Sequence, residues 1–175
     1  MSIKTDCDGN QYVDIDLTTE IQAKFVTADT INERRWIAFR YTMDNLRGKY
    51  PMGDGRVVSV TRKSADELTH DAHDDRIRVI PELANIIKIG KHPEIKDATH
   101  KLFIKFAYYD VTLKIGDDYY TAKINIGIKE DGESVLYQIN QFKEKATPSD
   151  IGRVRSPAPV GGVAIPTIYE ERQPR

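Results

Sequence analysis

The 175-residue sequence lacks several features that would narrow its class at once. Its single cysteine, Cys7, excludes an internal disulfide and a zinc site built only of cysteines. No stretch approaches the roughly 18 apolar residues of a membrane-spanning helix, and the first ten residues have no apolar run of the secretory type. We therefore expect a cytoplasmic protein that makes no contact with a membrane.

An excess of charge of one sign is also missing. The chain has 26 basic and 27 acidic residues, a formal charge of −1, which argues against coating nucleic acid by bulk charge. Between Lys88 and Lys129, however, eight lysines stand against five acidic residues, so a local basic groove is compatible with the sequence. With 39% hydrophobic and 30% charged residues, the composition is that of a globular domain.

The common motifs of nucleotide binding and metal-dependent hydrolysis are absent as well. The sequence contains no P-loop, no dinucleotide-binding glycine fingerprint, no nucleophile elbow and no HExxH pair. These absences disfavour the common nucleotide-binding and metalloprotease classes. We expect no cofactor and no bound metal.

The first half of the chain combines strand signals with helix signals. Strands are predicted at 11–16 and 56–61, each after a glycine-containing turn. The capping-box pair Thr30 and Glu33 predicts a helix over about 31–47. The large apolar side chains of that helix share one face, which we interpret as a core face: Trp36, Phe39, Met43 and Leu46.

The second half predicts strands joined by tight turns. Residues 102–114, 119–129 and 135–139 are rich in β-branched and aromatic residues, with Gly116 and Gly132 in the turns between them. Short connections between consecutive strands indicate an antiparallel meander. The predicted fold is α+β, with helices packed on one face of a roughly four-stranded antiparallel meander sheet and an extended C-terminal arm.

The domain boundary follows from the prolines. Five of the eight prolines lie between Pro148 and Pro174, and such a stretch cannot sustain regular strand pairing. We expect one domain over 1–146 and a Pro/Gly-rich arm over 147–175. Because the arm is expected to lie outside the core, its deletion should change the melting temperature little.

Alternation along 119–129 separates two faces of the strand. Apolar side chains, from Tyr120 to Ile128 at every second position, share one face, and Thr121, Lys123 and Asn125 share the other. The apolar face should pack on the helices. The polar face should be open and line the principal groove.

The densest polar segment is Lys63–Asp75. His70 and His73 could face one side of a short helix and form a metal site with nearby aspartates. A solvated acidic helix end is the plainer interpretation, and a catalytic imidazole is the third, because histidine titrates near neutral pH. Lys63, just before the helix, could present its charge to a phosphate.

Basic residues and tyrosines are interleaved from His100 onward. Lys101 and Lys105 lie near Tyr108 and Tyr109, and single-stranded nucleic acid is bound by ammonium groups that follow phosphates and rings that stack on bases. The alternative is an ordinary half-buried sheet, in which tyrosine is simply a favoured residue.

The order of several short segments resembles a known family. These segments are Asp8–Asp16, Asp54–Val60, Ile80–Leu83, Phe106–Asp110, Gly116–Tyr120 and Leu136–Ile139. Together they resemble, over roughly 8–142, the large polyvalent protein-associated domains of phages and conjugative elements, particularly the third kind. Those domains are assigned to the barnase–EndoU–colicin E5/D–RelE-like nuclease group. The resemblance implies helices on a four-stranded antiparallel sheet and metal-independent RNA cleavage.

In the implied reaction, a 2′-hydroxyl attacks the adjacent phosphate while a base takes its proton, an acid protonates the leaving 5′-oxygen, and a cation stabilises the phosphoryl charge. The candidate catalytic residues are His70, Lys63, Thr121 and Tyr137. The candidate RNA-binding residues are Lys101, Lys105, Lys123, Asn125 and Tyr109.

The leading hypothesis is a toxin-like, metal-independent RNase of phage or mobile-element origin, in the host cytoplasm if a phage encodes it. The alternative is a catalytically inactive module on the same fold that docks on a protein partner. Such docking would use the C-terminal arm or the His70–Asp75 segment.

Overall fold

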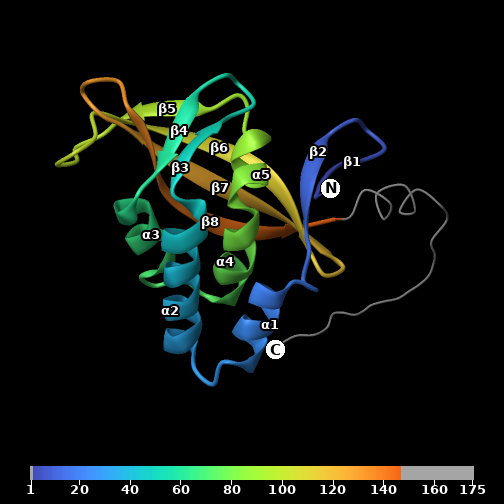
Figure 1. Cartoon of the computed structure of the whole chain (residues 1–175). Coiled ribbons are helices and arrows are strands. Elements are labelled where there is room, and N and C mark those ends of the chain that lie inside the picture. Colours follow the sequence, from blue (N-terminus) through green and yellow to red (C-terminus); the bar gives the residue numbers. More distant parts are fainter. Residues whose placement is uncertain (1, 147–175) are drawn as a thin grey trace, which may run out of the picture.

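Eight strands join into one mixed, curled sheet within residues 2–146, the part of the chain that the computed structural model describes (Figure 1). The strands are β1 (Ile3–Thr5), β2 (Gln11–Ile15), β3 (Gly48–Pro51), β4 (Val57–Val60), β5 (Glu94–Asp97), β6 (Lys105–Ile115), β7 (Asp118–Ile128) and β8 (Ser134–Lys145). Their order in the sheet is β1-β2-β6-β7-β8-β4-β3, and β5 pairs with β6.

The predicted four-stranded antiparallel meander is wrong. β6, β7 and β8 are consecutive antiparallel neighbours, but β2 runs parallel to β6, with Val13 opposite Leu113. β4 likewise runs parallel to β8, with Val58 opposite Ser134. Turn residues report only on strands that are adjacent in sequence. The N-terminal strands join the meander at its edges through long connections, for which no local pattern exists.

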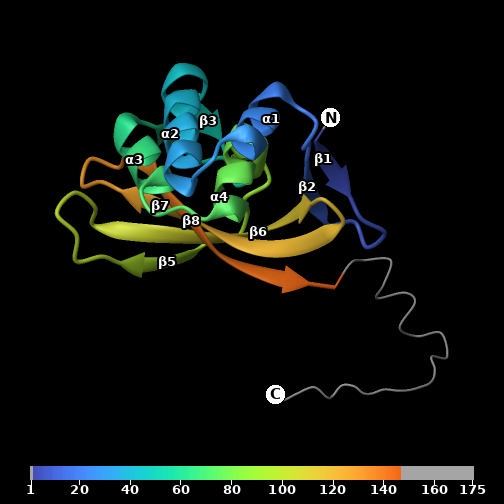
Figure 2. The ribbon, with the colours of Figure 1, turned by 90° about the horizontal axis from the view of Figure 1, so that it is seen from below.

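The helices lie against one face of this sheet (Figure 2). They are α1 (Glu20–Thr27), α2 (Ile31–Tyr41), α3 (Arg62–Thr69), α4 (Asp74–Val79) and α5 (Leu83–Lys88), with a π-helical turn at Thr42–Leu46 and a 3-10 turn at Ile80–Glu82. The predicted capping box of α2 is confirmed: the Thr30 hydroxyl accepts the Glu33 N–H at 3.1 Å, and the Glu33 carboxylate accepts the Thr30 N–H at 3.1 Å.

The core lies between the helices and this face of the sheet. Ala122, Ile124 and Ile126 of β7 are completely buried there, as the alternation predicted, and they meet apolar side chains such as Leu68 and Leu83 from the helical layer. Each fully buried Leu or Ile contributes roughly 1.5–3 kcal/mol through the hydrophobic effect.

The predicted core face of the 31–47 helix is wrong at its first position. Trp36 is 58% exposed and stacks on Phe39, with ring centroids 5.8 Å apart and planes 15° from parallel. The buried line of the helix instead runs through Ala38 and Thr42. Small side chains let α2 approach α3 and α4 closely, and a tryptophan at the same position would hold the helices apart.

Within residues 2–146, no helix is long and apolar enough to cross a membrane. The predicted arm over 147–175, and the prediction about its deletion, lie outside the described residues.

Candidate nucleic-acid interface

The sheet face opposite the helices, here called the outer face, carries polar and aromatic side chains. Because Ala122, Ile124 and Ile126 fill the core, strand alternation turns Thr121, Lys123 and Asn125 outward. The cross-strand neighbours of these three residues are Thr112, Asp110 and Tyr108 on β6 and Lys143, Asn140 and Gln138 on β8. The outer face is therefore a continuous surface over three strands.

This face has an excess of positive charge although the whole chain has none. By the strand register, seven lysines and three carboxylates occupy outer positions. The lysines are Lys4, Lys49, Lys96, Lys114, Lys123, Lys143 and Lys145, and the carboxylates are Asp14, Glu94 and Asp110. Three of the lysines form ion pairs: Lys4 with Asp14 at 2.8 Å, Lys123 with Asp110 at 2.9 Å and Lys96 with Glu94 at 3.7 Å. The excess of four positive charges over negative charges favours the binding of a polyanion to this face.

One end of the outer face carries a group of rings, here called the aromatic cluster: His100, Phe103, Phe106, Tyr108 and Tyr137. Phe103 is only 2% exposed, and its ring lies over Gly127, where an added Cβ would come within 2.6 Å of ring atoms. The glycine therefore makes room for the ring. The loop that carries Phe103 is fixed by the Ile104 N–H, which donates to the Ile128 carbonyl at 2.9 Å.

His100 has a defined orientation in this cluster. Its Nδ1 accepts the Leu102 N–H at 3.0 Å, and its ring stacks on Phe103 at 5.0 Å and meets Tyr137 edge-on at 5.6 Å. With Nδ1 accepting, the neutral ring carries its proton on Nε2. Its free nitrogen is thus a hydrogen-bond donor.

The outer face brings together four of the predicted site residues, Thr121, Lys123, Asn125 and Tyr137, and Lys101 follows His100 directly on the exposed part of the loop. The amide groups of Asn125, Gln138 and Asn140 lie between the lysines, and the Asn125 and Asn140 Oδ1 atoms are buried. The Asn140 Nδ2 donates to the Gln138 Oε1 at 2.7 Å beside Asn125.

Two predicted RNA-binding residues lie elsewhere. Tyr109 is completely buried on the core face, where its hydroxyl donates to Asp54 at 2.7 Å and accepts from Arg56 at 3.1 Å, so its ring cannot stack on a base. Burial, followed by the bond to Asp54, raises the pKa of Tyr109 to about 12. Lys105 stands opposite Ile128, so its side chain is on the same side of the sheet as the core residues. It is exposed because it lies at the end of the sheet.

The sequence contained the signal that was missed. Ala107, Val111 and Leu113 are apolar and stand at odd positions of β6, so Tyr109 belongs with them and Tyr108 with the outer face. The role of His100 had no such signal, because its position depends on a loop folding back over Gly127.

The predicted catalytic set is not assembled. Lys63 lies on α3 and His70 is the C-cap of this helix. The helix packs on the core side of β8 through a bond from the Ser64 hydroxyl to the Leu136 carbonyl at 2.6 Å. Thr121 and Tyr137 lie on the outer face, so the sheet separates the two pairs. Lys63 is instead paired with Glu67 at 3.2 Å, one helical turn away.

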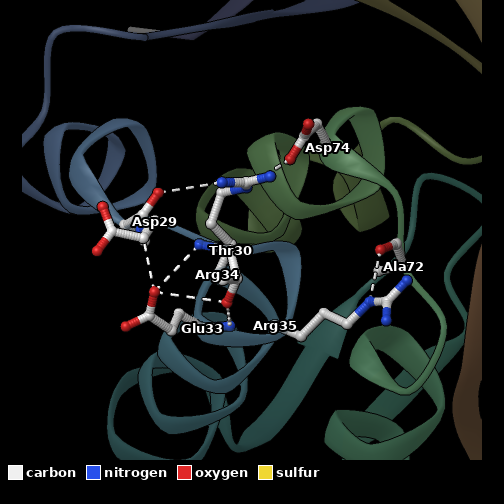
Figure 3. Close-up of polar contacts among 8 residues, drawn as sticks. Asp29, Thr30, Glu33, Arg34, Arg35, Ala72 and Asp74 are labelled. Carbon is white, nitrogen blue, oxygen red and sulfur yellow. Dashed lines mark hydrogen bonds and ion pairs between the residues drawn. The ribbon is translucent and has the colours of Figure 1, made fainter.

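The acidic segment around His70 is bound to α2 (Figure 3). The Arg34 guanidinium donates to Asp74 at 2.8 Å, and the Arg35 guanidinium donates to the Ala72 carbonyl at 2.9 Å. Among residues 2–146, no three His, Cys, Asp or Glu side chains converge as metal ligands would. The segment thus holds two helices together through its acidic and backbone oxygens.

A cavity of about 360 Å³ lies on the helix side, between α1, α2 and α4, lined by Phe25, Val26 and Ile77 among others. None of the polar residues Thr121, Lys123 and Asn125 lines it. Two other hollows of similar volume are lined by outer-face residues, one by Lys4 and Asp14 and the other by Lys49 and Ser59. Neither includes Thr121, Lys123 or Asn125, so these hollows do not coincide with the predicted principal groove.

Comparison with protein-family models matches residues 29–139 to the large polyvalent protein-associated domain 3. The matched segment runs from just before α2 into β8 and leaves out β1, β2 and α1. Comparisons with curated proteins and with solved structures gave no match.

Proposed function

The chain belongs to the large polyvalent protein-associated domain 3 family, which is associated with phages and mobile elements, and we propose that its outer face binds single-stranded RNA. The observation that carries the proposal is the segregation of charge and rings. A chain with a net charge of −1 collects seven lysines, three carboxylates and the aromatic cluster on the sheet face that none of the helices within residues 2–146 covers. Lysines neutralise phosphates, and exposed rings stack on unpaired bases.

The test is fluorescence anisotropy with a labelled, unstructured RNA and the full chain. Binding should weaken as salt rises, with log K falling by about 0.7 per log unit of salt for each phosphate neutralised. The paired charge reversal Lys143→Glu with Lys145→Glu should abolish most of the binding. Lys24→Glu on the exposed side of α1 is the matched control and should change it little. A protein that binds neither RNA nor the corresponding DNA contradicts the proposal.

Metal-independent cleavage of the bound RNA is the second candidate function. The observation that favours it is His100, an imidazole on the same face as the lysines. Cleavage by 2′-hydroxyl attack forms a cyclic 2′,3′-phosphate and breaks the bond from phosphorus to the 5′-oxygen, which takes up a proton. The Nε2–H of the neutral His100 ring can donate a hydrogen bond to a phosphate oxygen. Only the imidazolium, whose Nδ1–H would displace the Leu102 N–H, could give its Nε2 proton to the leaving oxygen. As a base it would first have to release the Leu102 N–H.

Incubating RNA with the protein in EDTA separates these functions. If cleavage occurs, His100→Ala should reduce it by about 100-fold or more, the usual effect of losing an acid–base group. His70→Ala, on the other side of the sheet, tests the catalytic role that the sequence analysis predicted for His70. Binding without cleavage supports an RNA-binding module, and the absence of both activities favours the docking of a protein partner.

A further inference from the structure

The two ends of the outer face repeat one arrangement, a tyrosine with a lysine ammonium over its ring. At one end the Lys96 Nζ lies 5.7 Å from the ring centroid of Tyr108, and at the other the Lys114 Nζ lies 5.8 Å from that of Tyr119. Each tyrosine is backed by a second ring: Phe106 lies 6.2 Å from Tyr108, and Tyr12 lies edge-on at 5.3 Å from Tyr119. In these two Tyr–Lys units, both tyrosines and Lys114 are half-buried, and Lys96 is exposed.

The strand register sets the distance between the units. Tyr108 stands opposite Asn125, and Tyr119 is six residues away from Asn125 on the same strand. At about 3.3 Å per residue the units are therefore about 20 Å apart along β7. That distance is about six stacking steps of roughly 3.4 Å, or about seven fully stacked nucleotides, and a slightly stretched strand of six nucleotides also covers it.

We infer that the outer face takes a single-stranded RNA segment of about six nucleotides along β7, with one base stacked on Tyr108 and another on Tyr119. The inference rests on the proposed RNA binding. It adds the length of the bound RNA segment and its direction along β7. Thr121 and Lys123 lie between the two units and meet the intervening phosphates and sugars. When a base occupies a ring, the flexible lysine above it moves aside to a phosphate.

The second unit depends on a part of the chain outside the family match. Tyr12 lies on β2, which precedes the matched residues 29–139, and β2 joins the sheet beside Lys114 through the parallel pair of Asp14 with Lys114. The N-terminal strands thus extend the binding surface beyond the matched domain.

The experiment compares labelled uridine oligonucleotides of two and six nucleotides on the full chain. The dinucleotide can reach one unit, so the second stacked base should make the hexanucleotide bind about 5-fold to 150-fold more tightly, beyond what its additional phosphates contribute. Tyr119→Leu should remove this part of the ratio, about 5-fold to 150-fold, and Tyr119→Phe, which retains the ring, should keep it. Tyr120→Leu, the neighbour that faces the core, is the control and should leave the ratio unchanged.

Equal affinity for the two oligonucleotides overturns the inference and leaves RNA binding intact. A Tyr119→Phe variant that loses as much as Tyr119→Leu also overturns it, because the hydroxyl rather than the ring would then be the contact. If the hexanucleotide does not bind at all, the proposed function itself fails.

Discussion

Alternate residues of β7 serve different purposes. Ala122, Ile124 and Ile126 are completely buried under the helices, and Thr121 and Lys123, one position along, are half-exposed among the lysines of the outer face. A strand has a side-chain period of two, so a single segment can present an apolar face and a polar face without compromise. The inner positions should govern stability and the outer positions binding.

The largest expected effect comes from breaking the inner face. Ile124→Ala should lower the free energy of unfolding by about 2–5 kcal/mol, because it removes buried methyl groups and leaves a cavity. Urea denaturation measures this loss. The affinity for RNA, measured where the variant is still folded, should be unchanged. A decrease in the free energy of unfolding of less than about 1 kcal/mol would show that the helices do not pack against Ile124.

Tyr109 offers a test of the inner face by pH. Its pKa is raised to about 12 by burial and by the bond to Asp54. Since this exceeds the ordinary value of about 10, the associated stability is fully present below about pH 10 and is lost as the pH rises towards 12, about 2–3 kcal/mol in all.

Tyr109→Phe removes this titration, so the difference in unfolding free energy between wild type and variant should shrink over that pH window. Urea denaturation at pH 7, 10 and 11.5 measures it. A constant difference across the three pH values would contradict the burial of an ionisable hydroxyl at this position.

A substitution at Gly127 tests the end of the outer face that carries the aromatic cluster. Gly127→Ala brings a methyl group within 2.6 Å of the Phe103 ring, so the ring must move, at a cost of about 1–3 kcal/mol. RNA affinity should fall as well, because Phe103 supports the aromatic cluster. Adding Phe103→Leu makes room for the methyl group and should recover part of the stability, which a double-mutant cycle detects. Strictly additive effects would mean that the two residues do not touch.

The smallest effect on stability is expected on the open part of the outer face. Lys143→Ala should change the unfolding free energy by less than about 0.5 kcal/mol. The salt dependence of RNA binding should become shallower by about 0.7 in slope if this lysine neutralises one phosphate. Lys24→Ala on α1 is the matched control, for which neither quantity should change. A stability loss above 1 kcal/mol for Lys143→Ala would break the division between the two faces.

Local patterns predicted local structure well. The Thr30–Glu33 capping box starts α2 as expected, and the alternation of β7 assigned its buried and outer side chains correctly. Both features depend on side chains within a few residues of each other, so propensity and periodicity are sufficient. The same parity rule, applied to β6, would also have placed Tyr108 rather than Tyr109 on the outer face.

The sequence by itself therefore determined the start of α2, the approximate positions of β2, β4, β6, β7 and β8, and the polar character of one strand face. Tertiary structure alone decided the parallel pairing of β2 with β6 and of β4 with β8, the exposure of Trp36, the position of His100 over the outer face, and the separation of His70 from Thr121 by the sheet. The physical reason is the separation in sequence of the contacting residues. Each of these outcomes depends on contacts between segments distant in sequence, whose free energy is set by how whole surfaces pack.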